Sequence, residues 1–367
     1  MCKQSNNISF LLGAGFSAPA GYPIGNSVNQ SVLEFRKQNS YFSLTGKLSH
    51  WHESGCNTEL GKFFPLFLDT IDYYAQNAQN YSKSFNYEEF FDFLKQEILK
   101  SHEYERWVRT KSSNMEINQN LVYAFLRIYN QVIEDIIYQR NKFSIRDYNP
   151  FIEWVVKRSK ENMINIHTLN HDLLLEGTLL PELISDGYQL KGSQYTCRNY
   201  SKNTDERLPM YTGKYQGNIR LYKLHGSFDQ FIYHEENGEN IHVKIPNKAD
   251  FSCIENNSGY KDISNYHPDF LSGTTSKIHR YKEPYYEKLL NCFEDNINNS
   301  EKIIVIGYGG NDSGINKMLA DNSHGQKMIV VCPTINSLFI DEMVAAGYEV
   351  LALKKTLGEV TSLDFDY

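Results

Sequence analysis

The stretch Ile8–Ala18, ISFLLGAGFSA, has the most bearing on the fold class of this sequence. Its first part, Ile8–Leu12, is a near-continuous apolar run, which is typical of a strand buried on both faces of a parallel sheet. The run leads into Gly13–Ala18, which has the G-x-G-x-x-G/A spacing of a strand-to-helix turn. In such a turn the glycines let the backbone approach a pyrophosphate, which the N–H groups at the helix start bind, and Ser17 adds a hydroxyl donor. The alternative is a tight turn with no ligand.

Further apolar runs of the same kind follow along the chain: Met163–His167, Ile219–Leu224, Ile303–Ile306, Met328–Val331 and Glu349–Leu353. Segments with helical apolar spacing lie between several of them, at Asp172–Leu183, Ser313–Leu319 and Asn336–Ala346. Strands that alternate with helices predict an α/β fold with a Rossmann-like, doubly wound parallel sheet. Ligands of such sheets bind beside the carboxyl ends of the strands, at a topological switch point.

The region 56–147 has a different pattern, with almost no Gly or Pro. Three segments there have helical spacing, Leu60–Gln76, Tyr87–Tyr104 and Leu121–Gln139. We therefore expect a helical insertion domain at 56–147 within a sheet domain formed by 1–55 and 148–367. These segments have more aromatic side chains than one apolar helix face needs, among them Tyr73, Tyr74 and Phe91. They predict either an interface, in an oligomer or over the ligand cleft, or a small local core.

Two polar stretches, Gly187–Gly217 and Asn237–Thr275, are predicted to be irregular loops over the ligand side of the sheet. A mobile loop there would keep catalytic groups misaligned until a partner binds, although plain surface loops are the alternative.

Three more polar motifs follow predicted strands. Thr168–Asp172, TLNHD, follows the second strand, and Lys223–Ser227, KLHGS, follows the third. Gly307–Asp312, GYGGND, is a glycine-rich turn that can offer N–H groups to phosphate or ribose oxygens. Each motif also has a structural interpretation, because Asp172 and Asp312 suit a helix cap and a single His at a strand end is often structural.

Composition excludes several classes of protein. The formal net charge is −7 and the sequence pI is about 5.9, which argues against a nucleic-acid-binding surface. No apolar run is long enough for a membrane helix, and the polar start Met1–Asn7 lacks a signal-peptide core. The six cysteines form no C-x-x-C pair, so a zinc ribbon is not encoded and no metal site is expected. Scattered single cysteines in a chain without an export signal predict a cytoplasmic protein with reduced thiols.

Taken in order, GAGFS, T-x-N-x-D, L-H-G-S and G-Y-G-x-x-D resemble the motifs of the SIR2 (sirtuin-like) family, and Gly21-Tyr22-Pro23 matches its G-x-P. The resemblance covers roughly 1–55, 150–235 and 275–367. It implies that NAD+ is bound as the substrate and that Asn170 and His225 are catalytic. Asn170 would orient water or a ribose hydroxyl, and His225 would be the general base. The implied NAD+-binding residues are Gly13, Ala14, Gly15, Phe16, Ser17, Pro23, Thr168, Asp172, Gly307, Tyr308 and Asp312.

Departures from the deacetylase branch point to a different activity. The paired C-x-x-C motifs of its zinc module are absent, Ile24-Gly25-Asn26 replaces its Asp-Phe-Arg segment, and the interval from Gly15 to Asn170 is far longer. The chain is more similar to the SIR2 proteins of bacterial anti-phage defence. That branch implies an NAD+ hydrolase that releases nicotinamide and ADP-ribose and depletes NAD+. It also implies a homo-oligomer and, because no sensor domain is fused, a HerA-type ATPase partner or, second, a short Argonaute.

Several alternatives stay open at this point. They are an NAD-dependent protein deacetylase, an NAD+- or ADP-ribose-binding sensor without catalysis, and a scaffold that only assembles a partner. A dehydrogenase would need an acidic residue about 20 positions after the first turn to bind the ribose. Glu34 falls there but lies within a helix-like run, Ser31–Lys37, and is given no role.

Overall fold

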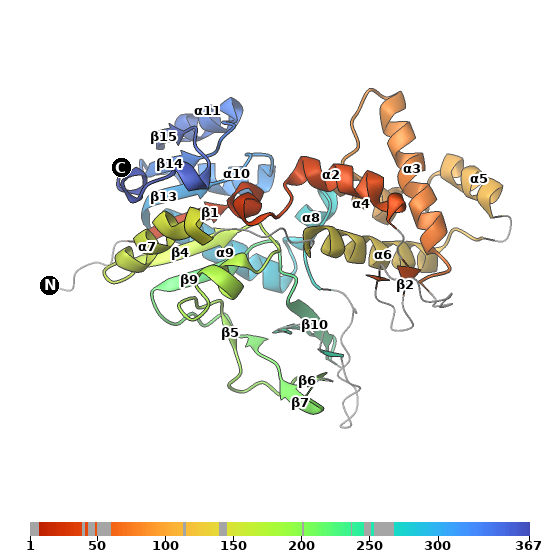
Figure 1. The fold of residues 1–367 in the computed structure, drawn as a ribbon, viewed down its shortest axis with the longest axis horizontal. Helices are drawn as coiled ribbons and strands as arrows, with labels where there is room; N and C mark the ends of the chain where they lie inside the picture. Colours follow the sequence, from red (N-terminus) through yellow and green to blue (C-terminus); the bar gives the residue numbers. More distant parts are fainter. Residues whose placement is uncertain are drawn as a thin grey trace. The chain divides into compact units, whose positions relative to one another are not determined.

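The computed structural model describes residues 7–38, 41–42, 48–49, 60–112, 115–138, 145–199, 202–235, 237–245, 251–252 and 268–367. Contacts divide the chain into two compact units (Figure 1). The sheet unit comprises Met1–Tyr22, Arg140–Phe270 and Tyr281–Tyr367, and the helical unit comprises Pro23–Gln139 and Leu271–Arg280. The helical unit is thus larger than the predicted insertion at 56–147, and the predicted boundary between 55 and 56 lies outside the described residues.

The sheet unit is built on six parallel strands in the order β15-β14-β13-β1-β4-β9. The strands are β1 (Asn7–Leu12), β4 (Met163–Thr168), β9 (Ile219–Lys223), β13 (Ser300–Ile306), β14 (Lys327–Val331) and β15 (Glu349–Leu353). Numbered along the chain, this is the order 3-2-1-4-5-6 of doubly wound dinucleotide-binding sheets, with its switch point between β1 and β13. The predicted fold class is confirmed, because every predicted apolar run forms a strand and all neighbouring strands are parallel.

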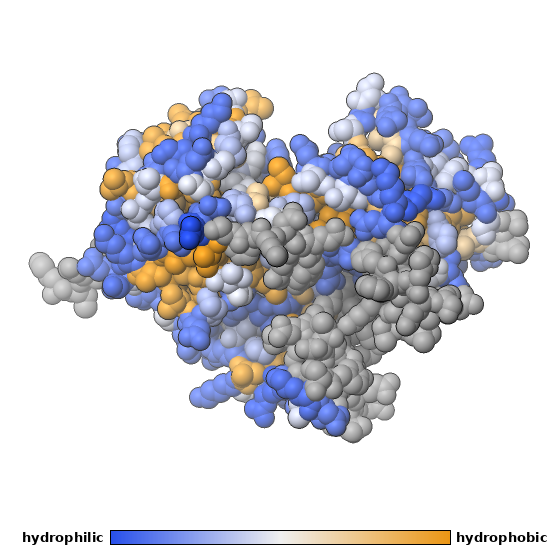
Figure 2. All heavy atoms as spheres, viewed as in Figure 1, coloured by the Kyte–Doolittle hydropathy of each residue, from blue (hydrophilic) through white to orange (hydrophobic). Residues whose placement is uncertain are grey.

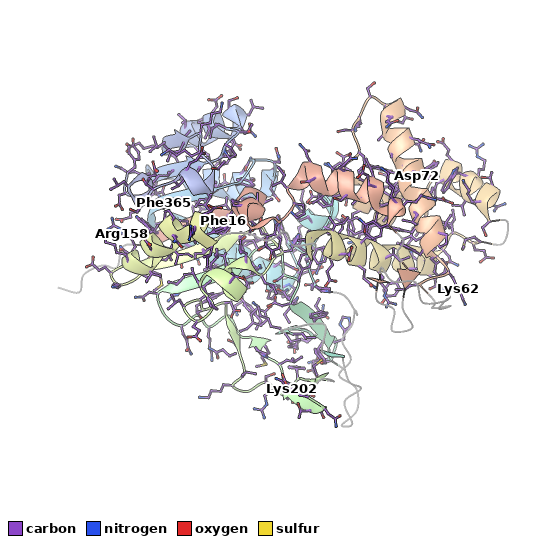
Figure 3. The ribbon with its side chains drawn as sticks, viewed as in Figure 1. Phe16, Lys62, Asp72, Arg158, Lys202 and Phe365 are labelled. Carbon is purple, nitrogen blue, oxygen red and sulfur yellow. The ribbon has the colours of Figure 1, made fainter. Side chains whose placement is uncertain are left out.

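Successive residues of β1 point to opposite faces of the sheet, and helices cover both faces. The Phe10 ring makes an edge contact with Phe151 of α7 (Asn149–Arg158) at a centroid distance of 5.4 Å. Phe365, which Figure 3 labels, is the last residue of η8 (Ser362–Phe365). Its ring centroid lies 6.4 Å from that of Phe10. On the other face, the Ser9 hydroxyl lies 3.4 Å from the Asn296 carbonyl of α9 (Pro284–Asn298). The sheet is therefore the middle layer of a three-layer core.

Of the three helices predicted between strands of the sheet, two are confirmed and one is wrong. Helices α10 (Ser313–Asp321) and α11 (Ser337–Ala346) form as expected after β13 and β14. The predicted helix at Asp172–Leu183 is reduced to one π-helical turn, η5 (Leu175–Leu179). The physical reason is Pro181, which has no N–H to continue the ladder and whose ring would clash with the carbonyl four residues back.

The stretches predicted to be irregular contain small antiparallel sheets instead. One has the order β10-β11-β8-β5 and the other β12-β6-β7. Their strands are β5 (Tyr188–Gln189), β6 (Thr196–Asn199), β7 (Thr204–Arg207), β8 (Met210–Tyr211), β10 (Gln230–His234), β11 (Asn240–Lys244) and β12 (Phe251–Ser252). Buried side chains such as Tyr195, Tyr233 and Val243 form their own core, which explains the order of these polar stretches. Residues 253–267 of the second stretch lie outside the described residues.

Most of the helical unit lies between β1 and β4 in the chain, but its segment Leu271–Arg280 follows β9. It contains α2 (Gly25–Glu34), η2 (Phe35–Lys37), α3 (Phe64–Asn80), α4 (Tyr87–Asp92), η3 (Phe93–Glu97), α5 (His102–Lys111), α6 (Gln119–Tyr138), α8 (Thr275–Arg280) and the strand pair β2 (Tyr41–Phe42) and β3 (Leu48–Ser49). The predicted single helix at Tyr87–Tyr104 is broken, because the Ser101 side chain accepts a hydrogen bond from Tyr104 N–H and starts a new helix.

Aromatic side chains pack inside the helical unit. Ring centroids are 4.7 Å apart for Tyr73 and Trp107, 5.1 Å for Tyr74 and Phe93, and 5.0 Å for Phe91 and Tyr129. In the view of Figure 2 the surface over α2 and α3 is mostly hydrophilic. These ring contacts support the local-core alternative for Tyr73, Tyr74 and Phe91. The interface stays a prediction. None of the helices in the described ranges is long and apolar enough to cross a membrane.

Candidate functional site

The two glycine-rich turns meet at the switch point of the sheet. Gly13 N–H donates to the Ile306 carbonyl at 3.0 Å, and Gly15 N–H donates to the Gly307 carbonyl at 2.9 Å. A Cβ atom on Gly13 would lie 2.7 Å from the Gly307 oxygen, and one on Gly15 would lie 2.8 Å from Gly307 Cα. Gly307 has φ +64°, and its Cβ would lie 2.2 Å from the Phe16 nitrogen. The glycines are thus required for the two turns to pack against each other, a reason that the spacing alone did not provide.

The first turn, with α1 (Ala14–Ser17), is braced from within the sheet unit. Phe16 is buried and its ring contacts Phe151 at 5.1 Å, so Phe16 can reach a ligand only through its backbone. Tyr148 donates its hydroxyl to the Phe16 carbonyl at 2.9 Å and accepts from Ala20 N–H at 3.1 Å. Burial raises the pKa of Tyr148, which keeps this hydroxyl protonated and able to donate. Ala14 is the exposed residue of the turn.

Asn170 joins the turn after β4 to the turn after β1. Its Nδ2 atom donates to the Gly13 carbonyl at 2.9 Å and to the Ser17 hydroxyl oxygen at 3.0 Å. The Gly13 carbonyl can only accept, which fixes the orientation of the amide and leaves Oδ1 as its acceptor atom. Thr168 is buried, and its hydroxyl accepts from Asn170 N–H at 3.1 Å. Asn170 therefore presents a carbonyl oxygen from a fixed position.

Asp172 holds the turn that follows Asn170. One of its carboxylate oxygens accepts from Leu174 N–H at 3.0 Å, as an Asx turn does. Its backbone carbonyl accepts from the Lys223 ammonium, which also pairs with Glu176 at 3.2 Å. Burial raises the pKa of Glu176 despite its lysine neighbours, Lys223 first. The sequence did not single out this buried ion pair, which ties the turn after β4 to the end of β9.

His225 lies at the end of β9 and contacts two polar side chains. Its Nε2 atom is 2.9 Å from the Tyr281 hydroxyl oxygen and 3.5 Å from Asp312 Oδ2. Tyr281 in turn donates its hydroxyl to Asp312 Oδ2 at 3.2 Å. His225 and Tyr281 are both buried, and their rings stack at a centroid distance of 6.0 Å. Sequence reasoning missed Tyr281, because it follows no strand-end motif and only the fold brings it to His225.

The turn after β13 uses its own polar atoms internally. Asp312 Oδ1 caps α10 by accepting from the N–H groups of Gly314 and Ile315, both at 3.1 Å. The Tyr308 hydroxyl accepts from Asp312 N–H at 3.1 Å and lies 2.8 Å from Asn316 Oδ1. The cap interpretation of Asp312 is confirmed, but its second oxygen is directed at His225 and Tyr281.

The sheet unit thus brings together all of the predicted site residues except Pro23, which is the first residue of the helical unit. A hollow of about 340 Å³ in the sheet unit is lined by residues 182–186, 188–189, 214 and 216–217, which include none of the predicted ones. The predicted residues meet instead as packed turns at the strand ends. Among the residues that the structure describes, no group of three or more His, Cys, Asp or Glu side chains is placed to hold a metal ion.

Strand order and turns define a Rossmann-like, doubly wound α/β protein. Solved structures similar to this chain are Sir2 family proteins. The structure described as "Structural Basis for the Mechanism and Regulation of Sir2 Enzymes" is 12% identical in sequence and has a TM-score of 0.42. The match covers 99% of this chain and 92% of that chain. A Sir2 homolog–NAD complex is 10% identical with a TM-score of 0.40, and the match covers 99% of this chain and 89% of that chain. Sir2 bound to acetylated peptide is 11% identical with a TM-score of 0.38, and the match covers 97% of this chain and 91% of that chain.

No family model matches the sequence, and no curated protein matches it. Identities of 10–12% transfer no activity to this chain, and its fold class rests on its own strand order.

Proposed function

We propose that this chain binds NAD+ at the switch point between β1 and β13 and hydrolyses the bond between nicotinamide and ribose. The observation that carries the proposal is the placement of Asn170. Its amide is bonded to Gly13 and Ser17, so the polar group assigned to catalysis is fixed on the turn assigned to the pyrophosphate. His225 follows the neighbouring strand of the same sheet. This arrangement at strand ends is the one in which doubly wound sheets bind ligands.

The bond to be broken already carries a good leaving group. The nicotinamide leaves as a neutral molecule, because the pyridinium nitrogen takes the electrons of the C–N bond, and no general acid is needed. The transition state at the ribose is oxocarbenium-like, as in glycoside hydrolysis generally. A water oxygen forms the new bond to the ribose carbon, and its proton passes to His225 as general base. Asn170 Oδ1 accepts from that water or from a ribose hydroxyl and orients it.

The remaining predicted residues would hold the rest of NAD+. Backbone N–H groups of Gly13–Ser17, with Ala14 exposed, would face the pyrophosphate. Gly307 and Tyr308 would line the adenosine half. Thr168 and Asp172 would act by supporting the turn that carries Asn170. Pro23 stays a predicted NAD+-binding residue on the basis of the sequence resemblance alone.

We further propose that the activity serves bacterial anti-phage defence by depleting NAD+ in the cytoplasm. On this proposal the chain is a homo-oligomer and acts with a HerA-type ATPase, with a short Argonaute as the second choice of partner. The support is the sequence resemblance to that branch, together with the absence of C-x-x-C pairs from a chain of six cysteines.

The experiment is an assay of nicotinamide and ADP-ribose release from NAD+ by the purified chain, alone and with a HerA-type ATPase. Equal amounts of both products are expected, without any acylated peptide. Release that requires an acetylated peptide would replace the hydrolase with a deacetylase. Binding of NAD+ by calorimetry without product under either condition would leave a sensor in its place.

A further inference from the structure

The contacts of His225 assign a proton to one of its ring nitrogens. Nε2 lies 2.9 Å from the Tyr281 oxygen and 3.5 Å from a carboxylate oxygen of Asp312. Tyr281 has one proton and donates it to Asp312 at 3.2 Å. The Tyr281 oxygen must then accept from Nε2–H, because a lone pair on Nε2 would face both this oxygen and a carboxylate.

We propose that Tyr281 and Asp312 are positioning residues for His225, which hold its ring with the proton on Nε2 and make Nδ1 the atom that accepts the proton of the attacking water. This inference rests on the proposed function for the identity of the reaction. The geometry of the three side chains does not depend on it.

The contacts around each member give the chain of hydrogen bonds a fixed geometry. Asp312 Oδ1 is held by two N–H groups at the start of α10, which aims Oδ2 at the other two residues. Side-chain exposure is 6% for His225 and 14% for Asp312, so bulk water screens their interaction weakly. The stacked ring of Tyr281 restricts rotation of the imidazole. A carboxylate beyond the hydroxyl stabilises the positive charge that the imidazole gains when Nδ1 takes a proton.

Proton balance is complete within these groups. When water attacks the ribose carbon, its proton moves to Nδ1, and the imidazolium then carries protons on both nitrogens. The Nε2–H group stays hydrogen-bonded to the Tyr281 oxygen, and the Tyr281 hydroxyl stays hydrogen-bonded to Asp312. After the products leave, Nδ1 returns its proton to solvent and the resting tautomer is restored.

The test has one readout that needs no catalysis. The chain is labelled with ¹⁵N-histidine, and His225 is identified among its 11 histidines by the signals lost in His225→Gln. We expect a protonated Nε2 and an unprotonated Nδ1 at a pH where the ring is neutral. In Tyr281→Phe we expect the two tautomers to mix. The control is Tyr348→Phe, which removes a buried tyrosine hydroxyl bonded to the Leu319 carbonyl in the same unit, and it should leave the His225 signals unchanged.

The second readout is kinetic. In Tyr281→Phe and in Asp312→Asn, we expect kcat for nicotinamide release to fall by about 10- to 1,000-fold while KM changes little, because the tautomer affects the chemical step. Asparagine is a good helix cap, so Asp312→Asn keeps the start of α10 and removes the charge. Circular dichroism and the thermal midpoint check that each variant is folded.

The outcomes separate the two proposals. Unchanged His225 signals in folded Tyr281→Phe would overturn the positioning role, as would an unchanged kcat in both variants. If the tautomer behaves as expected but the parent chain releases no nicotinamide with or without a partner, the proposed function fails and the positioning of His225 stands.

Discussion

Each compact unit has an aspartate at the start of a helix, and the two aspartates differ in what their second oxygen contacts. In the helical unit, Asp92 Oδ2 accepts from Thr274 N–H at 2.8 Å, from the Thr274 hydroxyl at 2.7 Å and from Thr275 N–H at 2.8 Å. Asp92 Oδ1 accepts from Ser276 N–H at 3.0 Å. In the sheet unit, Asp312 caps α10 with one oxygen and directs the other at His225 and Tyr281.

The protonation of Asp92 follows from this difference. Burial would raise the pKa of its carboxyl. Hydrogen bonds from the Ser276 and Thr274 side chains and from the backbone N–H groups of Thr275 and Ser276 lower the pKa to about 2. All of these donors are neutral groups that do not titrate near neutral pH. Asp92 therefore has only a structural role, which is to hold the end of α4 to the start of α8. A capping carboxylate acquires a second role when one of its oxygens faces a side chain that can exchange protons. We expect variants of the two regions to separate activity from stability.

The largest effect is expected from the strand-end residues of the sheet unit. Asn170→Ala and His225→Ala should each reduce NAD+ cleavage by about 10²–10⁴-fold, the usual contribution of general acid–base catalysis, with the fold retained. Nicotinamide release measures the loss, and circular dichroism checks the fold. Cleavage at the parent rate by either folded variant would remove that residue from the mechanism.

A glycine pair tests whether the two turns at the switch point depend on each other. Gly307→Ala places a Cβ 2.2 Å from the Phe16 nitrogen, and Gly307 already has φ +64°. We expect a loss of about 2–5 kcal/mol in the free energy of unfolding, together with weaker NAD+ binding. Gly217→Ala is the matched control, because Gly217 has φ +74° and nothing within 4 Å of its Cβ position. It should lose only the backbone cost, about 1–2 kcal/mol. Equal losses from the two substitutions would show that the contact between the turns is unimportant.

The contact between the two turns also changes what we expect of a substitution at Gly15. Spacing alone predicts that Gly15→Val blocks the cofactor more than it harms stability. The structure places the Gly15 Cβ position against Gly307 Cα, so we expect Gly15→Val to destabilise the sheet unit as well. A thermal midpoint equal to that of the parent would favour the original expectation.

The helical unit should show the opposite behaviour at Asp92. Asp92→Asn keeps a capping side chain but loses the charge, and we expect about 1–2 kcal/mol less stability with nicotinamide release per folded molecule unchanged. Because the folded-state pKa of Asp92 is lowered to about 2, its contribution is complete above the unfolded pKa of about 4 and is lost as the pH falls toward 2. Urea unfolding of the parent and Asp92→Asn from pH 6 to pH 2.5 should therefore show the gap closing with acid. A constant gap would mean that the charge is not what stabilises the cap.

The smallest effects are expected at exposed ion pairs, which should be alike in both units. Glu105 and Arg109 lie 2.7 Å apart on α5, and Lys317 and Asp321 form a similar pair on α10. Arg109→Ala and Lys317→Ala should each leave the midpoint of urea unfolding unchanged within error, because solvent screens exposed pairs. A clear shift of the midpoint at either position would indicate a charge network that these two contacts do not explain.

Much of the sheet unit could be predicted from sequence, for a physical reason. Strands buried on both faces must be apolar throughout, so runs such as Ile8–Leu12 and Ile303–Ile306 are visible without alignment. Their order in the sheet is not visible, because it depends on contacts between distant segments. The helix predicted at Asp172–Leu183 was wrong, because the prediction rested on apolar spacing and Pro181 prevents a helix from continuing through this segment.

The site could be predicted only where a residue follows a strand. Asn170, His225 and Asp312 all do, and the structure brings them to one edge of the sheet. Tyr281 follows the segment 271–280 of the helical unit, and a tyrosine there has no distinctive spacing. The buried pair of Lys223 and Glu176 was missed for a similar reason, since its members are distant in sequence.

The central position of β1 also sets the order in which the chain can be completed on the ribosome. Both strands that pair with β1 are made later, β4 at 163–168 and β13 at 300–306, so β1 is fully paired only after β13 has been made. Asp92 likewise waits for Thr274–Ser276 to emerge. Most of the helical unit emerges before β4 and, since domains generally fold as units beginning at the N-terminus, can fold while β1 is still unpaired. Closure of the switch point, and with it the assembly of Asn170, His225 and Asp312, must then wait until β13 and the start of α10 have been made.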